Sequence, residues 1–434
     1  MGPHYILVPM EEIFVVALFV LVLVFIGSEL ANRTVVALLG AAVVVASGIV
    51  EQSEAAVEFI DWNTVGLLAG MMIIVAVLNK TGVFEYLAIK SAQWGKARPG
   101  RILILLGAVT AFLSAFLDNV TTVILMVPVT FLIADALGVS PLPFLLAQVM
   151  ASNVGGAATL IGDPPNILIG SAAGLSFADF VVNLAPLVIL TLPVVLGLFY
   201  LMFRKDLRAN RDAEAAIGAL DAGGAIRDRV LLRKSLLVLG AVILGFFLHG
   251  LLHLEAATIA LFGGAVLMLY ARSDVEEVLR EVEWPTLLFF VGLFVLVGGL
   301  EVTGFVGRIA EFLTGVGGSP ALTAMLVMWG SAAASGIVDN IPFTATMIPV
   351  VQELAQAEGL SEAAVRPLWW ALAIGADFGG NLTLIGASAN VVVAGMSERA
   401  GRRITFLQFL AYGIPVTLVS LAVATPYVLL RYYL

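Results

Sequence analysis

The chain is dominated by uninterrupted apolar runs that are long enough to cross a lipid bilayer as helices. Ten such runs occur over its 434 residues, at 11–30, 33–50, 62–79, 141–178, 182–203, 232–251, 256–271, 286–300, 367–396 and 408–430. Only 12% of the residues are charged, which is too few to cover a soluble fold of this size. Because the runs are continuous and do not alternate, a transmembrane β-barrel is excluded. We therefore predict an all-α polytopic, multi-pass protein of the cell (inner) membrane.

Two further apolar stretches carry a polar pair at their middles. Asp118-Asn119 interrupts residues 101–137, and Asp339-Asn340 interrupts residues 320–355. Each limb has about 15–18 apolar residues, which is short for a full span. We interpret each stretch as a re-entrant hairpin that enters and leaves on one side. The alternative is two full crossings with a polar tip.

The positive residues are distributed unevenly over the connecting segments. With ten spans and two hairpins, 19 of the 22 Lys and Arg residues fall on one side, and only Arg308, Arg366 and Arg431 fall on the other. The positive-inside rule then places both termini outside, although full crossings by both hairpins would give a similar split. The charged stretch 204–231 is interpreted as a solvated cytoplasmic linker. It separates a first membrane half, 1–203, from a second, 232–434.

The two halves resemble one another at an offset of about 221–224 residues. Asp61-Trp62-Asn63-Thr64 matches Glu283-Trp284-Pro285-Thr286, and the run Gly155–Gly162 matches Gly379–Gly386. Five spans per half is an odd number, so the second half is inserted upside down. The pattern predicts two inverted repeats, each of five spans with a re-entrant hairpin and a broken helix. Secondary transporters use this architecture, with the site near the bilayer midplane.

Four carboxylates lie inside apolar sequence, at Asp118, Asp163, Asp339 and Asp377. Such groups are costly in a membrane and are functional by default. No Lys or Arg lies in the same segments, which leaves cations, protons and neutral polar groups as partners. We predict that Asp118, Asp339 and Asp377 couple transport to protons. Asp163 is the candidate structural residue, because it can cap the helix that begins at Pro164. We therefore expect Asp163→Asn to reduce transport less than the same change at the other three aspartates.

Glycine-rich motifs surround these carboxylates. Asn153–Thr159 and Asp377–Thr383 are interpreted as unwound loops whose carbonyls face an ion and whose amides face an anion. The alternative for the glycines alone is close helix contact. The predicted substrate- or ion-binding residues are Asp118, Asn119, Thr121, Asn153, Gly155, Gly156, Thr159, Asp163, Asn166, Asp339, Asn340, Thr344, Asp377, Gly379, Gly380, Asn381, Thr383, Ser388 and Asn390.

Other chemistry is poorly represented in the sequence. The absence of cysteine excludes disulfides and thiolate metal sites, and His249 and His253 are interpreted as interface residues. We expect no cofactor, no resident metal, no nucleic-acid partner and no enzyme activity. Without a Walker A motif, ATP-driven pumping would require a separate ATPase partner. A passive channel is the alternative from another class, but the polar residues form midplane clusters and not a continuous lining.

The motifs resemble the signature stretches of the ion transporter superfamily. The resemblance rests on Phe116–Thr122 and Asn153–Asn166, and in the second half on Asp339–Thr344 and Gly380–Asn390. Within the superfamily they are similar to the arsenite permease ArsB, the NhaD sodium/proton antiporters and the melanosomal P protein. The resemblance covers essentially the whole chain. It implies two hairpins, two broken spans, an elevator-like motion and a scaffold region that often forms a homodimer.

The leading functional hypothesis is proton-coupled efflux of arsenite or antimonite, and hence arsenical resistance. Arsenite near neutral pH is an uncharged trihydroxy acid, and a chain without thiolates can release it. The residues expected to bind its hydroxyls are Asn119, Asn340, Asn381, Thr159 and Thr383. Sodium/proton antiport of the NhaD type is the close alternative. Organic anion (dicarboxylate) transport comes third, because the predicted site lacks an arginine and the tips carry Asp118-Asn119-Val120 and Asp339-Asn340-Ile341, where the dicarboxylate branch has Ser-Asn-Thr.

The topology is tested by cysteines introduced at positions 220 and 315 of this cysteine-free chain. We expect an impermeant maleimide to label position 315 from outside and position 220 only after the membrane is opened. Labelling of both positions in intact cells would contradict the predicted orientation.

Overall fold

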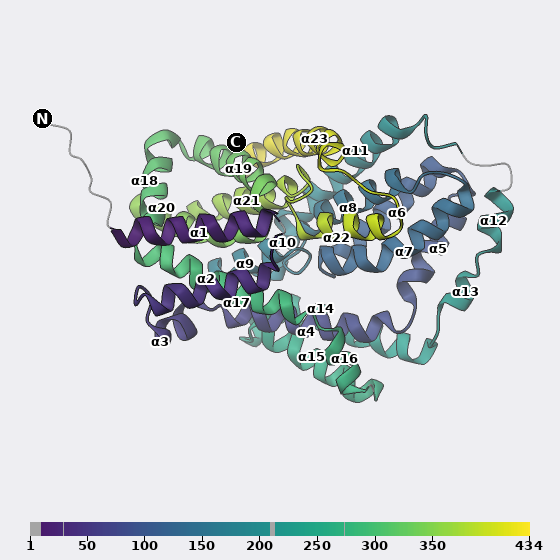
Figure 1. Cartoon of the computed structure of the whole chain (residues 1–434), viewed down its shortest axis with the longest axis horizontal. Coiled ribbons are helices and arrows are strands. Elements are labelled where there is room, and N and C mark those ends of the chain that lie inside the picture. Colours follow the sequence, from purple (N-terminus) through teal and green to yellow (C-terminus); the bar gives the residue numbers. More distant parts are fainter. Residues whose placement is uncertain (1–9, 29, 209–212, 273) are drawn as a thin grey trace, which may run out of the picture.

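The computed structural model describes residues 10–28, 30–208, 213–272 and 274–434, and these residues form helices and no strands (Figure 1). The helices of the first half are α1 (Met10–Ser28), α2 (Arg33–Ala46), α3 (Gln52–Glu54) with the π-helical turn η1 (Ala55–Phe59), α4 (Trp62–Asn79), α5 (Val83–Trp94), α6 (Pro99–Ser114), α7 (Asn119–Leu137), α8 (Leu142–Gly156), α9 (Pro164–Ala173), α10 (Phe177–Asn183) and α11 (Ala185–Phe203). Residue 29 of the first predicted span lies outside the described residues.

The second half repeats this order of elements. Its helices are α14 (Arg229–Leu252), α15 (Ala256–Ala271), α16 (Val275–Glu281), α17 (Trp284–Val302), α18 (Phe305–Gly317), α19 (Pro320–Val338), α20 (Asn340–Ala357), α21 (Glu362–Gly379), α22 (Ser388–Arg399) and α23 (Phe406–Tyr432). Among the described residues, eight helices are long and apolar enough to cross a membrane, or nine if a bent pair counts as one span. Two predicted spans, α2 and α15, are shorter apolar helices. The predicted fold class is confirmed.

Two helix pairs each join one half of the chain to the other. Helix α4 packs against α15 of the other half, and its repeat mate α17 packs against α2. A Cβ on Gly70 would lie 2.5 Å from the backbone nitrogen of Leu261, and one on Gly292 would lie 2.7 Å from the carbonyl carbon of Ala37. Small residues permit such close helix contact in membranes. The same contact is therefore built twice, once by each repeat.

The contacts also give the direction of the helices. Gly66 lies against Ala257, and Gly264 lies against Ile73, so α4 and α15 run parallel. Helices α2 and α4 of the first half run in opposite directions (Figure 1). Helix α15, the mate of α2, therefore runs opposite to α2, and the second repeat is inverted.

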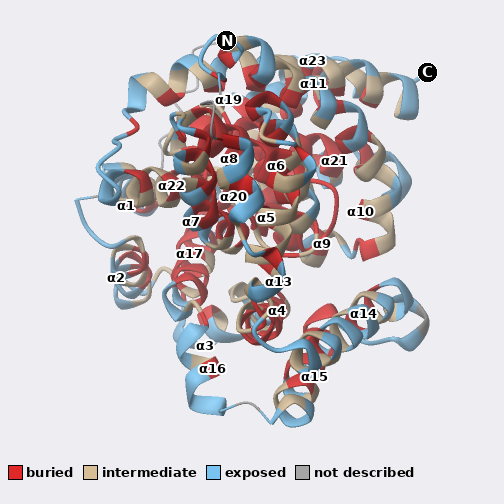
Figure 2. Ribbon diagram, turned by 90° about the vertical axis from the view of Figure 1, so that its right-hand side faces the viewer, coloured by how far each residue is buried: buried red, intermediate tan, exposed pale blue. Residues whose placement is uncertain are grey.

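The helices divide into two units. We call α1, α2, α4, α14, α15 and α17 the scaffold unit, and α5–α11 with α18–α23 the core unit. Most buried residues lie in the core unit, whereas α14 and α15 stand at the edge of the molecule (Figure 2). The units meet where α17 packs on α20 and α4 packs on α9.

Each pair of limbs, α6–α7 and α19–α20, places its tip beside a break in a neighbouring span. Helix α7 packs on α22 and α20 packs on α9, so each hairpin reaches the broken helix of the other repeat. A full crossing would bring the tip to the end of a span and not to its middle. This geometry favours the hairpin interpretation.

The run 141–178 bends more than its sequence predicts. After the first break, helix α9 ends at Ala173 and the chain turns by 117° into α10. Gly174 adopts a left-handed conformation (φ 62°), which glycine reaches without strain. Ser176 and Asp179 then form a capping box that starts α10.

The described part of the linker 204–231 is largely exposed, but it is not a plain loop, because it contains two short helices. Its short helices α12 (Ala213–Ala219) and α13 (Ala222–Ala225) pack against α5, and α12 also contacts α7. The small apolar side chains of Ala213, Ile217 and Ala222 are buried there. The Gln93 side chain donates to the Leu220 carbonyl over 2.9 Å. Residues 209–212 lie outside the described residues.

Gly70→Val tests the contact between α4 and α15. Its side chain would press on the backbone of α15, which cannot move aside, so we expect a loss of about 1–3 kcal/mol in unfolding free energy. Denaturation in detergent, followed by tryptophan fluorescence, measures the loss. The control is Gly240→Val in α14, because a Cβ at Gly240 meets nothing within 4 Å. Equal losses in both variants would contradict the proposed packing.

Candidate functional site

The two hairpin tips begin their second limbs in the same way. Asp118 accepts a hydrogen bond from the Thr121 amide (2.8 Å) and caps α7, and Thr121 also donates its hydroxyl to the same carboxylate. Asp339 accepts from the Ile341 amide (3.0 Å) and caps α20. Both carboxylates are thus engaged by the first turn of their own helix. Asp339 also has φ 93°, a conformation that a non-glycine residue adopts only at a cost.

The two broken spans are held by matched side chains. Asn166 donates to the Gly156 and Thr159 carbonyls (3.3 and 3.0 Å), and its mate Asn390 donates to the Gly380 and Thr383 carbonyls (2.7 and 2.9 Å). The hydroxyls of Thr159 and Thr383 donate to carbonyls of the adjacent hairpins, at Ala115 and Gly336. These polar groups stabilise the breaks, so their amide and hydroxyl hydrogens are already used.

The unwound segments are shorter than the glycine motifs predict. Helix α8 continues to Gly156 and α21 continues to Gly379, so neither Gly155 nor Gly379 is in a loop. A Cβ on Gly155 would lie 2.2 Å from the Ala111 carbonyl oxygen, and one on Gly379 would lie 2.5 Å from that of Ala332. These two glycines serve close backbone contact with the hairpins, which corrects the loop interpretation. Gly156 and Gly380 stand where the breaks begin and present carbonyls to Asn166 and Asn390.

Asp163 joins the two hairpin tips at the centre of the molecule. Its Oδ2 accepts from Asn119 Nδ2 (2.7 Å) and its Oδ1 accepts from Asn340 Nδ2 (3.1 Å). The side chain is fully buried and makes no capping hydrogen bond to α9. The prediction that Asp163 is only a helix cap is therefore wrong. Its mate Ala387 has nearly the same extended backbone, so the carboxylate itself is unique to the first repeat.

An asparagine network continues from this carboxylate into the second repeat. Asn119 Nδ2 also donates to Asn153 Oδ1 (3.0 Å), and Asn153 Nδ2 donates to Asn381 Oδ1 (2.9 Å) and Asn390 Oδ1 (3.2 Å). Asn381 Nδ2 donates to the Met150 carbonyl (3.2 Å). Every side-chain amide at the centre therefore donates to a protein acceptor.

Asp377 stands apart from this network. It is fully buried in α21, and neither carboxylate oxygen accepts a hydrogen bond of good geometry among the described residues, although the side chain of Asn166 lies beside it. Asn119 Oδ1, Asn166 Oδ1 and the hydroxyl of Thr344 are also buried without a partner there. The charge of Asp377 lies within electrostatic reach of Asp163. Of the three aspartates predicted to couple protons, this is the one whose carboxylate accepts no well-formed hydrogen bond among the described residues.

The structure also shows a basic group that the sequence analysis missed. Arg33, the first residue of α2, donates to the hydroxyls of Ser388 and Thr286 (3.3 Å to Thr286). Ser388 in turn donates to Asp339 Oδ2 over 3.0 Å. The expectation that no basic group reaches the carboxylates is wrong, because Arg33 lies far from them in sequence and reaches them only through folding. The sequence offered one signal for this role, because Arg33 is the first residue of the apolar run 33–50.

Burial raises the pKa of Glu283, which lies one residue before α17, and the charge of Asp118 raises it further. The hydrogen bond from Thr286 and the charge of Arg33 oppose this shift. Glu283 and Arg33 therefore face the hairpin tips from the scaffold unit.

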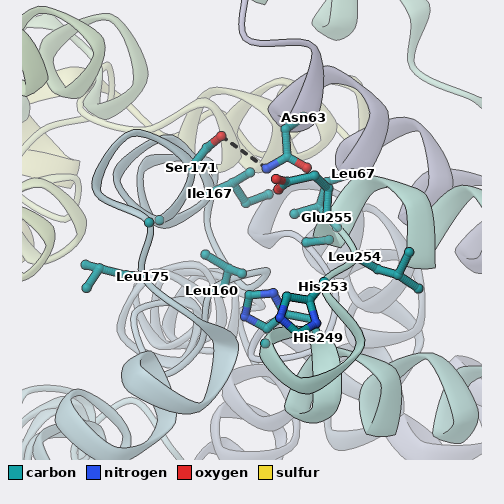
Figure 3. A pocket seen from close by; sticks show the side chains of 14 residues that line it. Asn63, Leu67, Leu160, Ile167, Ser171, Leu175, His249, His253, Leu254 and Glu255 are labelled. Carbon is teal, nitrogen blue, oxygen red and sulfur yellow. Dashed lines mark hydrogen bonds between the residues drawn. The ribbon is translucent and has the colours of Figure 1, made fainter.

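Two cavities border the hairpin tips at the end of the molecule where α2 and α17 begin. One, of about 370 Å³, is lined by Arg33, Asp339 and Ser388, and another, of about 260 Å³, by Thr121, Asn79 and Glu283. A cavity of about 350 Å³ near the other end contains His249, His253 and Glu255, with Asn63 hydrogen-bonded to Ser171 on its wall (Figure 3). No residue of the central network lines that cavity. The described residues contain no group of three or more His, Asp or Glu side chains arranged to hold a metal.

An inverted-repeat bundle with two hairpin tips meeting two broken spans defines a membrane transporter. The chain belongs to the citrate transporter family, whose model, described as "Citrate transporter", matches residues 20–375. The protein is therefore a transporter and not an enzyme.

Similar proteins support this assignment over nearly the whole chain. It is 48% identical to "Uncharacterized transporter Rv2684" of Mycobacterium tuberculosis, covering 96% of this chain and 98% of the relative. It is 45% identical to the "46 kDa membrane protein" of Mycobacterium leprae, with 97% and 99% covered. The human P protein is 36% identical over 93% of this chain but only 58% of its own length. The likeness to the P protein is confirmed, whereas that to ArsB and NhaD stays a prediction.

Two solved structures share the fold at low sequence identity. The YdaH transporter of Alcanivorax borkumensis matches with a TM-score of 0.59 at 15% identity, covering 97% of this chain and 98% of that one. MtrF of Neisseria gonorrhoeae, described within a class of antimetabolite efflux pumps, matches with a TM-score of 0.59 at 12% identity, covering 99% and 96%. At these identities the likeness concerns the fold alone.

Asp163→Asn tests the bridge between the hairpin tips. The new amide would face the amides of Asn119 and Asn340, leaving one donor unpaired at a cost of about 1–3 kcal/mol. We expect a lower unfolding temperature in detergent and at least tenfold slower transport. Asp118→Asn is the stability control, because asparagine keeps a helix cap. A D163N protein as stable as D118N would contradict the bridging role.

Proposed function

We propose that this protein is a proton-coupled secondary active transporter that exports a small uncharged hydroxy acid, with arsenite or antimonite as the leading substrate. The observation that carries the proposal is the imbalance of hydrogen-bonding groups at the centre. Its side-chain amides all donate to protein acceptors, whereas Asp377 and the Oδ1 atoms of Asn119 and Asn166 accept no well-formed hydrogen bond among the described residues.

Such a site matches a ligand that brings hydrogens or positive charge. The three hydroxyls of arsenite are donors, and unpaired buried acceptors gain most from them because an unsatisfied buried group costs about 1–3 kcal/mol. A proton on Asp377 removes the cost of an uncompensated charge in the membrane interior. Substrate and proton would then compete for the same carboxylate, which is the requirement for exchange.

Sodium/proton antiport is the second candidate, and the same unpaired oxygens favour it. Carboxylate and amide oxygens are suitable ligands for Na⁺, and Asp377 would then bind Na⁺ and H⁺ alternately. Neither candidate needs a free donor from the protein.

The family description suggests citrate as the substrate, but the hydrogen-bonding groups of the central network are poorly suited to bind it. A carboxylate substrate needs donors, and the amides at the centre are occupied within the protein. Arg33 reaches the Asp339 hairpin tip through Ser388, and it already shares its hydrogens with Ser388 and Thr286. We therefore rank organic anions below the other two classes.

The proposal is tested in proteoliposomes containing a pH-sensitive dye, to which arsenite, antimonite, Na⁺, Li⁺ and citrate are added in turn. We expect saturable proton movement with arsenite or antimonite and none without substrate. Movement with Na⁺ or Li⁺ alone would select the antiporter, and movement with citrate alone would overturn the proposal. Proton flux that needs no substrate would indicate a channel.

Asp377→Asn tests the coupling carboxylate in the same vesicles. We expect at least a hundredfold loss of substrate-driven proton movement, with unchanged or greater thermal stability, because a buried unpaired carboxylate is removed. The control is Asp274→Asn, an exposed cap of α16. Proton coupling retained in D377N would exclude this carboxylate from the mechanism.

A further inference from the structure

Arg33 lies at the boundary between the two units and contacts both of them. Its own helix, α2, packs on α17 within the scaffold unit. Thr286, one of its hydrogen-bond partners, belongs to α17, and Ser388, the other, begins α22 of the core unit. The side chain also lies over the ring of Phe289, 5.3 Å from the centroid. The guanidinium is therefore held by Thr286 and Phe289 of the scaffold unit, and it also contacts Ser388 of the core unit.

The hydrogen bonds around Arg33 form one continuous chain with a consistent direction. Arg33 donates to Ser388, and Ser388 donates to Asp339 Oδ2 over 3.0 Å. Arg33 also donates to Thr286, and Thr286 donates to Glu283 Oε2 over 3.1 Å. One positive group thus serves two carboxylates, each through a single hydroxyl. One carboxylate belongs to the scaffold unit and the other to the core unit.

The repeat shows that the fold does not require this arginine. The mate of Arg33 is Ala256, which likewise is the first residue of its helix, α15. The contact between α15 and α4 forms without a basic residue there. Arg33 is therefore an addition to one repeat only, and it lies with Asp339 in the wall of the cavity of about 370 Å³.

We propose that Arg33 is a positioning residue that acts as the counter-charge of Asp339 through Ser388, and that it sets the pH range in which the transporter works. The proposal rests on the proposed proton-coupled function and deepens it. With the guanidinium in place, Asp339 is neutralised without a proton and the hairpin tip is held against the scaffold. Separation of the core unit from α2 leaves Asp339 without its counter-charge, so that a proton or cation must replace it.

Other charges near Asp339 act in the opposite sense. Asp163 lies within electrostatic reach of Asp339, Asp118 and Asp377, and Glu283 lies within reach of Asp118 and Arg33. Apart from Arg33, all five of these groups are carboxylates. Arg33 is the positive group within electrostatic reach of Asp339 and Glu283, so its removal must change how readily protons leave these two carboxylates.

Arg33→Gln keeps hydrogen-bonding capacity and removes the charge. In the proteoliposome assay we expect the pH of half-maximal transport to rise by about one unit, because protons leave the cluster less readily without the guanidinium. Arg33→Lys, which restores the charge, should bring the pH profile back toward that of the wild type. Arg366→Gln, at a half-buried arginine of α21 that pairs with Glu362 and Asp179 and lines no central cavity, is the matched control.

Ser388→Ala keeps the charge but removes the hydroxyl between Arg33 and Asp339. We expect a shift in the same direction as in R33Q, and no further shift when the two changes are combined, because both interrupt one pathway. If R33Q does not accumulate in the membrane, the pH profile of S388A still tests whether Arg33 acts on Asp339 through Ser388.

The outcomes separate this proposal from the function on which it rests. Wild-type protein that shows no coupled proton movement overturns the proposed function. Coupled movement in wild type, with R33Q and S388A both keeping the pH profile of the wild type, overturns the role of Arg33. A loss of rate in R33Q without a pH shift, not rescued by R33K, assigns Arg33 to packing alone and also overturns the proposal.

Discussion

The hydrogen bonds that Asp163 accepts from Asn119 and Asn340 hold the centre of this transporter together. A carboxylate in a membrane interior is tolerated only with partners, and here the partners come from the tips of two hairpins that belong to opposite repeats. This requirement fixes how far each hairpin penetrates and forces both tips to the same depth. The broken spans must then open at that depth, where Asn166 and Asn390 satisfy the carbonyls released by the breaks. The positions of all four elements therefore follow from the burial of one carboxylate.

The repeats supply a nearly symmetric frame, and the chemistry lies in its departures from symmetry. The asparagines and threonines that hold the breaks occur in both halves, as do the small residues at the helix contacts between the halves. Asp163, Asp377 and Arg33 occur once each, with Ala387, Asn153 and Ala256 as their mates. The repeated residues build the same contacts on both sides of the site. The unpaired carboxylate and the counter-charge each occur on one side only, so they make the site asymmetric. We infer that the frame supports the movement and that the unpaired groups make it depend on protons.

Much of this fold was predictable from the sequence, because the bilayer imposes simple rules on length and polarity. Helices α4 and α15 begin and end where the apolar runs 62–79 and 256–271 do, and the hairpin tips lie at the polar pairs. The reach of Arg33 was not predictable, because it lies in the predicted cytoplasmic segment and meets Ser388 355 positions away. The role of Asp163 was misjudged for a similar reason: a local signal, the following prolines, favoured a cap, whereas long-range amides determine its contacts. The helices α12 and α13 of the linker were not predicted, because their few apolar residues lie among many charged ones in the sequence.

The central claim is that Asp377 exchanges a proton for substrate. Infrared difference spectroscopy of the reconstituted protein, with arsenite or Na⁺ added and removed, measures this exchange directly as a change in the carbonyl stretch of a protonated carboxyl. We expect the protonated band to decrease when substrate binds and the change to be absent in D377N. A difference spectrum without a carboxyl band, or the same band in D377N, would contradict the claim.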